Sequence, residues 1–156
     1  MPAPRKGVEL IIAEDDEDDY FLTKSAFEKA GLSNELVWVR NGEELLEQMR
    51  SRTGKGGAAD GRAMLVILDL NMPRMDGREA LSRIKADPEL RRVPIIVMTT
   101  SNAEEDIVRS YDQGACSFIH KPVTFAAFVE AANLLKRYWL EMVELPDAGG
   151  APWTKI

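Results

Sequence analysis

The run Leu65–Leu68 contains four consecutive large apolar residues, and the carboxylate of Asp69 follows it directly. Apolar residues without alternation are typical of a strand covered on both faces, as in parallel sheets flanked by helices. Asp69 then lies at the carboxyl end of the strand, where ligands bind in open α/β sheets. A proline and an Asp-Gly pair within residues 70–77 indicate a defined loop. We therefore expect Asp69 to stand at the mouth of a crevice.

Further apolar runs at 8–13, 36–39, 93–98 and 117–120 are typical of four more strands. Helical patterns lie between and after them, around residues 18–30, 45–49, 80–84, 102–113 and 125–145. Asn102 and Glu105 resemble a capping box for the fourth helix. Since connections between parallel strands are right-handed, the expected fold is α/β: a doubly wound, five-stranded parallel sheet flanked by five helices.

The length of 156 residues and an apolar content of 45% fit a single folded domain. We expect a disordered tail over residues 1–7, the domain over 8–146 and a C-terminal tail over 147–156. The segment 51–63 contains four glycines among small polar residues, which favours a flexible loop without an assigned function.

The charge is unevenly distributed along the chain. There are 20 basic and 26 acidic residues, and six of the acids form the uninterrupted run Glu14–Asp19. Without a basic stripe, binding to nucleic acid or to an anionic membrane is not expected, whereas a cation is a natural ligand. A single cysteine, no leader-like start and no apolar stretch near 20 residues predict a cytoplasmic protein without a membrane segment.

Polar residues follow four of the predicted strands at their carboxyl ends. They are Glu14 and Asp15, Asp69, Thr99, and Lys121. Because the carboxyl ends of parallel strands meet at one edge of a sheet, we expect these side chains to converge.

The motifs at these positions resemble the receiver domain of bacterial two-component response regulators over nearly the whole chain. In order, they are Glu14-Asp15, Asp69-Leu70-Asn71-Met72-Pro73 with Asp76-Gly77, Thr99, and Lys121-Pro122. The chain is most similar to single-domain regulators that partner phytochrome-type sensor histidine kinases, through Thr99-Thr100-Ser101, Ser110-Tyr111 and the ending Tyr138-Trp139-Leu140-Glu141 with Leu145-Pro146. The resemblance implies the flavodoxin-like receiver fold for residues 8–146. It also implies a phosphoacceptor signalling protein rather than an enzyme, acting by conformational change and protein contact.

The resemblance also implies a chemical role for each carboxylate. Asp69 would accept the phosphoryl group from a phosphohistidine of the kinase. Mg²⁺ would be held by Glu14, Asp15, Asp69 and the main-chain carbonyl of Asn71, which are hard oxygen ligands of the kind this ion prefers. From the residues alone, Asp16 remains an alternative for one member of the acidic pair, and the other acids of the run are interpreted as a solvated loop and helix start.

Further residues have roles that the same resemblance implies. Lys121 would reach the phosphoryl oxygens, aimed by a cis bond to Pro122, and Thr99 would donate its hydroxyl. Phe118 occupies the aromatic switch position. Asn71 and Ser101 are expected to tune the rate of dephosphorylation. His120, the single histidine, is interpreted as a bystander.

Three competing functions share parts of this pattern. A metal-dependent phosphohydrolase with an aspartate nucleophile would need an acid at position 71, where an asparagine stands. A flavin or nucleotide site would need a phosphate-binding loop after the first strand, where six acids would repel phosphate. A scaffold that is never phosphorylated would not need all the transfer residues.

The last helix predicts a homodimer. Its apolar residues repeat at heptad-like steps: Phe125, Phe128, Ala132, Leu135, Trp139 and Met142. A helix over 125–145 would be about 30 Å long and would overhang the domain. It would expose an apolar patch of Tyr138, Trp139, Leu140, Met142, Val143 and Leu145. The alternative is that this helix folds back onto its own core.

Overall fold

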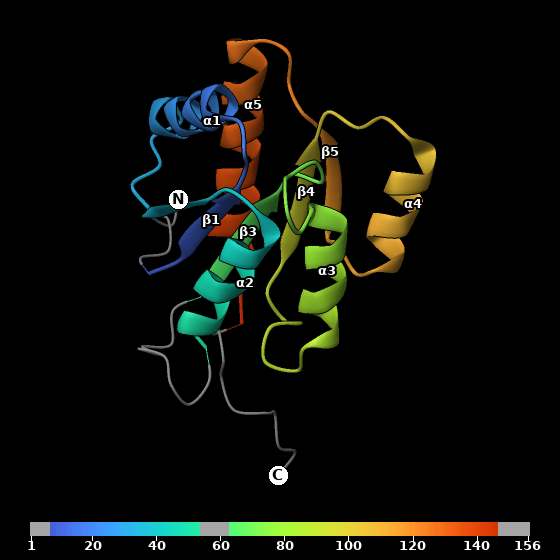
Figure 1. The fold of residues 1–156 in the computed structure, drawn as a ribbon. Coiled ribbons are helices and arrows are strands. Elements are labelled where there is room, and N and C mark those ends of the chain that lie inside the picture. Colours follow the sequence, from blue (N-terminus) through green and yellow to red (C-terminus); the bar gives the residue numbers. More distant parts are fainter. Residues whose placement is uncertain (1–6, 54–62, 147–156) are drawn as a thin grey trace.

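The computed structural model describes residues 7–53 and 63–146 (Figure 1). The predicted C-terminal tail, nearly all of the predicted N-terminal tail and most of the glycine-rich segment lie outside the described residues. No helix within the described part of the chain is long and apolar enough to cross a lipid bilayer.

Five parallel strands form one sheet in the order β2-β1-β3-β4-β5. They are β1 (Glu9–Ala13), β2 (Leu36–Val39), β3 (Met64–Leu68), β4 (Ile95–Thr99) and β5 (Ser117–His120). The register pairs Ile12 with Ile67 in β3, and Ile67 with Ile96 in β4. The predicted strands are confirmed, although β4 begins two residues later than the apolar run. Pro94, which has no N–H to donate, precedes it and accepts a hydrogen bond from Val66.

Helices cover both faces of this sheet, as predicted. They are α1 (Glu17–Lys29), α2 (Gly42–Ser51), α3 (Gly77–Ala86), α4 (Glu104–Asp112) and α5 (Phe125–Leu135), which continues as the π-helical segment η2 (Lys136–Met142). Helices α2 and α3 pack on one face with Leu45 and Leu81, and α1 and α5 pack on the other with Phe27 and Phe128. In Figure 1, α4 lies beside β5 at the edge of the sheet.

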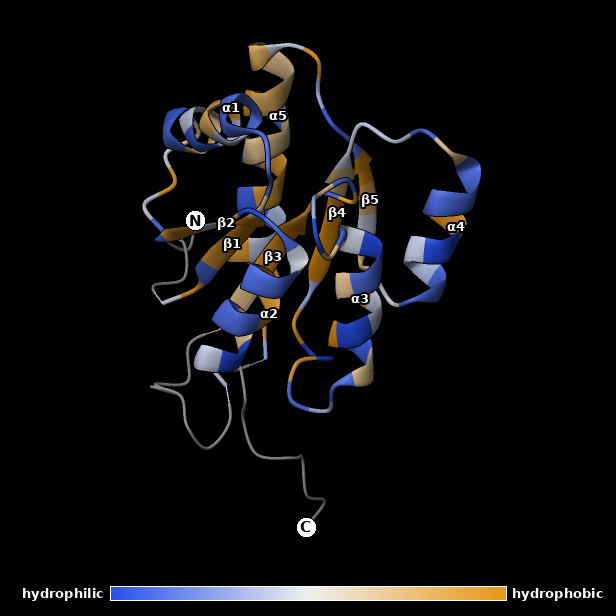
Figure 2. Cartoon of the chain, viewed as in Figure 1, coloured by the Kyte–Doolittle hydropathy of each residue, from blue (hydrophilic) through white to orange (hydrophobic). Residues whose placement is uncertain are grey.

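The three central strands are buried along their whole length. All residues of β1, β3 and β4 are buried, and alternate side chains enter the two apolar clusters on opposite faces. In Figure 2, the central strands are correspondingly hydrophobic, while the outer helices carry mixed colours. The single acid inside a strand, Glu9, forms an ion pair with Arg52. Loops that leave these strands therefore start from fixed positions.

Four helices begin with a side-chain cap, but α4 does not. Asp16, Asn41, Asp76 and Thr124 each accept a hydrogen bond from a backbone N–H in the first turn of their helix. The predicted capping box of α4 is wrong, because Ala103 is its N-cap residue and no side chain caps it. The N-terminus of α4 is instead held by tertiary contacts, described below.

The extended last helix is confirmed, since α5 and η2 run without a break from Phe125 to Met142, but the end of this helix packs differently from the prediction. The helix stops at Met142, and Leu140 is 1% exposed within the same apolar cluster as Phe128. Trp139 and Leu145 also pack against this cluster, so the predicted overhang is wrong and the fold-back alternative holds. The reason is the π-helical turn, in which Val143 N donates to Tyr138 O. The wider turn rotates the apolar stripe and directs Leu140 into the core.

Candidate functional site

The predicted acidic residues converge at the carboxyl edge of the sheet. Glu14 and Asp15 follow β1, and Asp69 follows β3. One carboxylate oxygen from each lies within 4.8 Å of the others. Glu14 and Asp69 are each 5% exposed, whereas Asp15 is exposed to solvent. Such a set of hard oxygen donors with one open side fits a divalent cation such as Mg²⁺.

The structure decides the register within the acidic run. The carboxylate of Asp16 accepts a hydrogen bond from Asp19 N at 2.9 Å and caps α1, and it is not among the three carboxylates of the cluster. The backbone of Glu14 is fixed on both sides, since its N–H donates to Val39 and its carbonyl accepts from the Trp38 indole at 2.7 Å. Glu14 and Asp15 are thus the pair that reaches the site.

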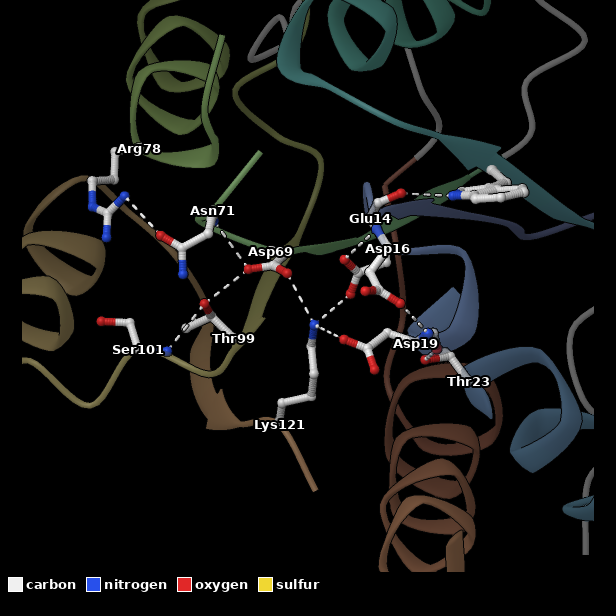
Figure 3. Close-up of polar contacts among 11 residues, drawn as sticks. Glu14, Asp16, Asp19, Thr23, Asp69, Asn71, Arg78, Thr99, Ser101 and Lys121 are labelled. Carbon is white, nitrogen blue, oxygen red and sulfur yellow. Dashed lines mark hydrogen bonds and ion pairs between the residues drawn. The ribbon is translucent and has the colours of Figure 1, made fainter. Parts of the chain in front are cut away.

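Lys121 is the cation at the centre of this cluster (Figure 3). Its Nζ donates to Glu14 Oε1 at 2.5 Å, to Asp19 Oδ2 at 2.9 Å and to Asp69 Oδ2 at 3.0 Å. Burial by itself lowers the pKa of Lys121, but the hydrogen bonds to these carboxylates outweigh it and raise the pKa. The ammonium therefore stays charged and compensates part of the acidic cluster.

The surroundings of Glu14 raise the pKa of its carboxyl group. Burial raises the pKa of this carboxyl, the hydrogen bond from Lys121 lowers it, and the nearby Asp69 charge raises it again. The result is a pKa of about 7. Crowded carboxylates therefore carry an electrostatic cost that a bound cation would relieve.

The carboxylate of Asp69 is oriented by donors on both of its oxygens. Oδ1 accepts from Thr99 Oγ1 at 2.8 Å and from Asn71 N at 3.0 Å, while Oδ2 accepts from Lys121. Thr99 is completely buried at the end of β4. The Thr99 hydroxyl, the Asn71 amide and the Lys121 ammonium thus fix the orientation of the Asp69 carboxylate.

The loop after Asp69 requires a glycine at position 77. Gly77 N donates to Leu70 O at 3.0 Å, and a Cβ at position 77 would lie 2.2 Å from the Asp69 carbonyl oxygen. No side chain fits at that distance. The Asp-Gly signal in the sequence therefore marks both the cap of α3 by Asp76 and a close backbone approach to Asp69.

One predicted feature of the Lys121 loop is wrong. The resemblance implied a cis bond to Pro122, but the described residues contain no cis peptide bond. Lys121 reaches the carboxylates with a trans bond, because its own N–H donates to Thr99 O at 2.8 Å and places the residue beside β4. Pro122 lies between the end of β5 and the N-cap of α5, in a segment without regular secondary structure.

The remaining predicted residues lie near the site or at a distance from it. Phe118 is half-buried against the core, with its ring edge-on to the exposed His120. Tyr138, Trp139 and Met142 lie on η2, which follows the 11 residues of α5, whereas Lys121 precedes the N-cap of α5. They belong to a different surface.

Two groups of functional contacts were not predicted from the sequence. The first is Asp19, interpreted as a solvated helix start but bonded to Lys121. The second is a polar cluster in which Arg78 of α3 donates to both oxygens of Asp106 in α4 at 2.7 Å. Ser101 Oγ donates to the same carboxylate at 2.6 Å. No local sequence pattern predicts this cluster, because Arg78 and Asp106 are 28 positions apart and belong to different helices.

The cluster has a clear electrostatic signature. The hydrogen bonds from Arg78 and Ser101 hold the pKa of Asp106 at about 2, below its ordinary value. The same pairing raises the pKa of Arg78. Arg78 therefore links α4 to the loop after Asp69, where it also approaches the Leu70 carbonyl at 3.4 Å.

Comparison with known proteins identifies this arrangement. The profile of the response regulator receiver domain matches residues 10–133. The chain belongs to this family. It is thus a phosphoacceptor signalling protein rather than a classical enzyme, with the carboxyl-edge constellation of a receiver.

Individual relatives cover most of the receiver chain. The probable methanogenesis regulatory protein FilR2 of Methanothrix harundinacea is 35% identical, over 84% of this chain and 83% of its own length. Response regulator Rcp1 of Synechocystis is 30% identical, over 89% of this chain and 93% of its own. A structure of Rcp1 in its Mn²⁺-bound form aligns with a TM-score of 0.75, at 29% identity over 88% of this chain and 98% of that one.

A third relative is a phytochrome response regulator. The phosphorylated cyanobacterial phytochrome response regulator RcpA aligns with a TM-score of 0.78 and 34% identity, covering 89% of this chain and 98% of that one. The family and the fold are therefore shared with regulators of this kind, and the acidic triad of Glu14, Asp15 and Asp69 is typical of a receiver metal site.

Proposed function

We propose that Asp69 accepts a phosphoryl group from a phosphohistidine of a sensor histidine kinase. The observation that carries this proposal is the preorganised Asp69 carboxylate, fixed by Thr99, Asn71 N and Lys121 beside Glu14 and Asp15. In phosphoryl transfer a protein mainly positions groups and compensates charge, and these residues are suited to both tasks.

The transfer is an in-line displacement at phosphorus. An oxygen of Asp69 forms the new P–O bond while the P–N bond to the kinase imidazole breaks. The electron pair of the broken bond stays on the imidazole nitrogen, which takes up a proton from water. The Thr99 hydroxyl and the Lys121 ammonium then donate to oxygens of the transferred group.

Glu14, Asp15 and Asp69, together with the Asn71 carbonyl, would hold Mg²⁺ at this site. The ion supplies charge compensation for the phosphoryl oxygens. The Mn²⁺-bound form of Rcp1 supports a divalent cation in a relative of similar fold. In this chain the fit rests on three carboxylate oxygens within 4.8 Å of one another.

The response requires movement at two residues. Phe118 is half-buried on β5, the strand that pairs with β4. When the Thr99 hydroxyl moves from Asp69 to the phosphoryl group, it leaves free space next to the Phe118 ring. We infer that the Phe118 ring turns inward and alters the β4–β5 surface for a protein partner. Asn71 and Ser101 tune the rate at which water removes the phosphoryl group.

We propose that the cognate kinase is phytochrome-type. The receiver domain, proposed to comprise residues 8–146 as a single-domain regulator, would act in the cytoplasm. RcpA is named as a phytochrome response regulator, and it aligns over 98% of its own length. The support for a phytochrome-type kinase is that this chain and RcpA share one fold. Phosphotransfer from a phytochrome kinase, compared with unrelated histidine kinases at equal concentration, tests the assignment; a faster unrelated kinase would contradict it.

Intact-mass spectrometry tests the phosphoacceptor assignment. With acetyl phosphate and Mg²⁺, the wild type is expected to gain the mass of one phosphoryl group, and Asp69→Asn is expected to gain none because the attacking oxygen is lost. Asp112→Asn, an exposed residue at the end of α4, is the matched control and should behave as wild type. Phosphorylation that survives Asp69→Asn excludes Asp69 as the acceptor.

A further inference from the structure

Lys121 uses all of its hydrogen-bond donors before any phosphoryl group arrives. An ammonium carries three N–H groups, and here they face Glu14, Asp19 and Asp69. The lysine side chain is 7% exposed, so water has little access to replace any of these partners. A phosphoryl oxygen on Asp69 therefore gains a bond from Lys121 only if one carboxylate releases it.

The three carboxylates differ in what else they bind. Glu14 and Asp69 belong to the acidic cluster that fits a cation, whereas Asp19 does not. Asp19 lies in the first turn of α1, on the far side of Lys121 from Thr99 in Figure 3. Its carboxylate therefore draws the ammonium toward α1 and away from the phosphoryl position.

The position of Asp19 is fixed by its own backbone. Its N–H donates to Asp16 Oδ1 at 2.9 Å, and its carbonyl accepts from Thr23 Oγ1 at 2.8 Å. Its side chain is 32% exposed, which is less open than the neighbouring Asp18. The acid is held in place by a capped helix rather than carried on a mobile loop.

We propose that Asp19 is a positioning residue that competes with the phosphoryl group for Lys121 and thereby restrains phosphorylation of Asp69. This inference rests on the proposed function and adds a regulator of the same site. In the phosphorylated state Lys121 leaves Asp19 and donates to the phosphoryl group. A side chain at position 19 that binds Lys121 more weakly than aspartate should therefore favour phosphorylation of Asp69.

The test compares rates of phosphorylation by acetyl phosphate at saturating Mg²⁺, followed by intact mass. In this reaction an oxygen of Asp69 bonds to phosphorus, and acetate leaves with the electron pair of the broken P–O bond. For Asp19→Asn the second-order rate constant is expected to rise about threefold, the scale of one partly exposed ion pair. Asp19→Glu, which restores a carboxylate, is expected to return the rate toward wild type.

Asp18→Asn is the matched control, because it removes one charge from the same acidic run at an exposed position. A general charge effect on the anionic donor would raise both rates equally. The effect through Lys121 is isolated by a double-mutant cycle: in a Lys121→Ala background, Asp19→Asn should no longer accelerate phosphorylation.

The outcomes separate this inference from the function on which it rests. A wild type that gains no phosphoryl mass overturns both. A phosphorylated wild type overturns the Asp19 inference alone in either of two cases: Asp19→Asn is no faster than Asp18→Asn, or its acceleration persists without Lys121.

Discussion

At the scale of single residues, Asp106 shows how a polar contact replaces a helix cap. The buried residues of α4 are Asp106 and Ser110, both polar, so this helix has little apolar anchorage. The bidentate pair with Arg78 and the hydrogen bond from Ser101 fasten it to the rest of the receiver. Charge-assisted pairs of this geometry are stronger than neutral hydrogen bonds. Loss of the carboxylate charge should therefore loosen α4.

The first prediction concerns the pH dependence of Asp106→Asn. Because the folded pKa of about 2 lies below the unfolded value, the carboxylate stabilises the fold above about pH 4, and this contribution disappears as pH falls toward 2. The variant should be destabilised by about 2 kcal/mol at pH 7. Denaturant unfolding at pH 7 and pH 3 should show this difference shrinking at the lower pH. A difference that is independent of pH would contradict the assignment, and Asp112→Asn serves as the exposed control.

Crowding of Glu14, Asp15 and Asp69 leads to a second prediction. Like charges at this separation repel, so the metal-free receiver should be less stable than its cation-bound form. Mg²⁺, which binds only the folded state, should raise the melting temperature. Asp15→Asn should raise the melting temperature without Mg²⁺ and reduce the response to it.

Thermal melts with and without Mg²⁺ measure both effects. Asp18→Asn, which lies outside the cluster, should retain the full Mg²⁺ response. Equal responses in Asp15→Asn and wild type would show that this carboxylate is not a ligand.

At the scale of elements, the last helix shows how one irregular turn redirects a surface. The heptad-like stripe is real, but Phe128, Ala132 and Leu135 pack into the core of this chain, against the α1 side. After Leu135 the backbone widens into η2, and the fully buried residue of the next turn is Leu140 instead of Trp139, while Met142 is exposed. The Lys136 ammonium also donates to the Ala30 carbonyl at 2.9 Å, which fastens η2 to the end of α1.

The buried position of Leu140 gives a third prediction. Leu140→Ala should lower the free energy of unfolding by about 2–5 kcal/mol, because it leaves a cavity in a packed core. Met142→Ala, at a side chain that is 68% exposed, should change it by less than about 0.5 kcal/mol. Chemical denaturation of both variants measures the difference. Similar values for the two would indicate that η2 does not pack as described.

At the scale of the whole molecule, the exposed face of the last helix is a candidate surface for homodimer formation. The side chains of Leu134, Tyr138 and Met142 are 62%, 51% and 68% exposed and recur at four-residue steps along the last helix. A row of large apolar side chains on the surface is typical of an interaction site. We propose a homodimer on this row, without the buried Leu140.

Light scattering tests the dimer as the fourth prediction. Wild type is expected to be dimeric, and the double variant Tyr138→Glu and Met142→Glu is expected to be monomeric because charges would be buried at the interface. Neither residue contacts Lys121 or the carboxylates that it binds, so phosphorylation by acetyl phosphate should persist in the variant. A monomeric wild type, or a variant that stays dimeric, would exclude this surface.

Local sequence patterns were sufficient to predict the sheet, the helices and the side chains that converge at the carboxyl ends of the strands. Apolar runs and helical spacing are local patterns, and the carboxyl ends of parallel strands meet at one edge whatever the details of packing. The strand order therefore brings four predicted side chains into contact: Glu14, Asp69, Thr99 and Lys121.

Contacts between elements that are distant in the sequence could be found only in the folded structure. Asp19 meets Lys121 across 102 positions of the chain, and Arg78 meets Asp106 across 28, which no local pattern encodes. The uncapped start of α4 is held by the second of these pairs. The inward turn of Leu140 depends on a π-helical turn that the apolar spacing of the last helix does not reveal. Side-chain packing between distant elements fixed each of these features, because their energies arise only once the fold has formed.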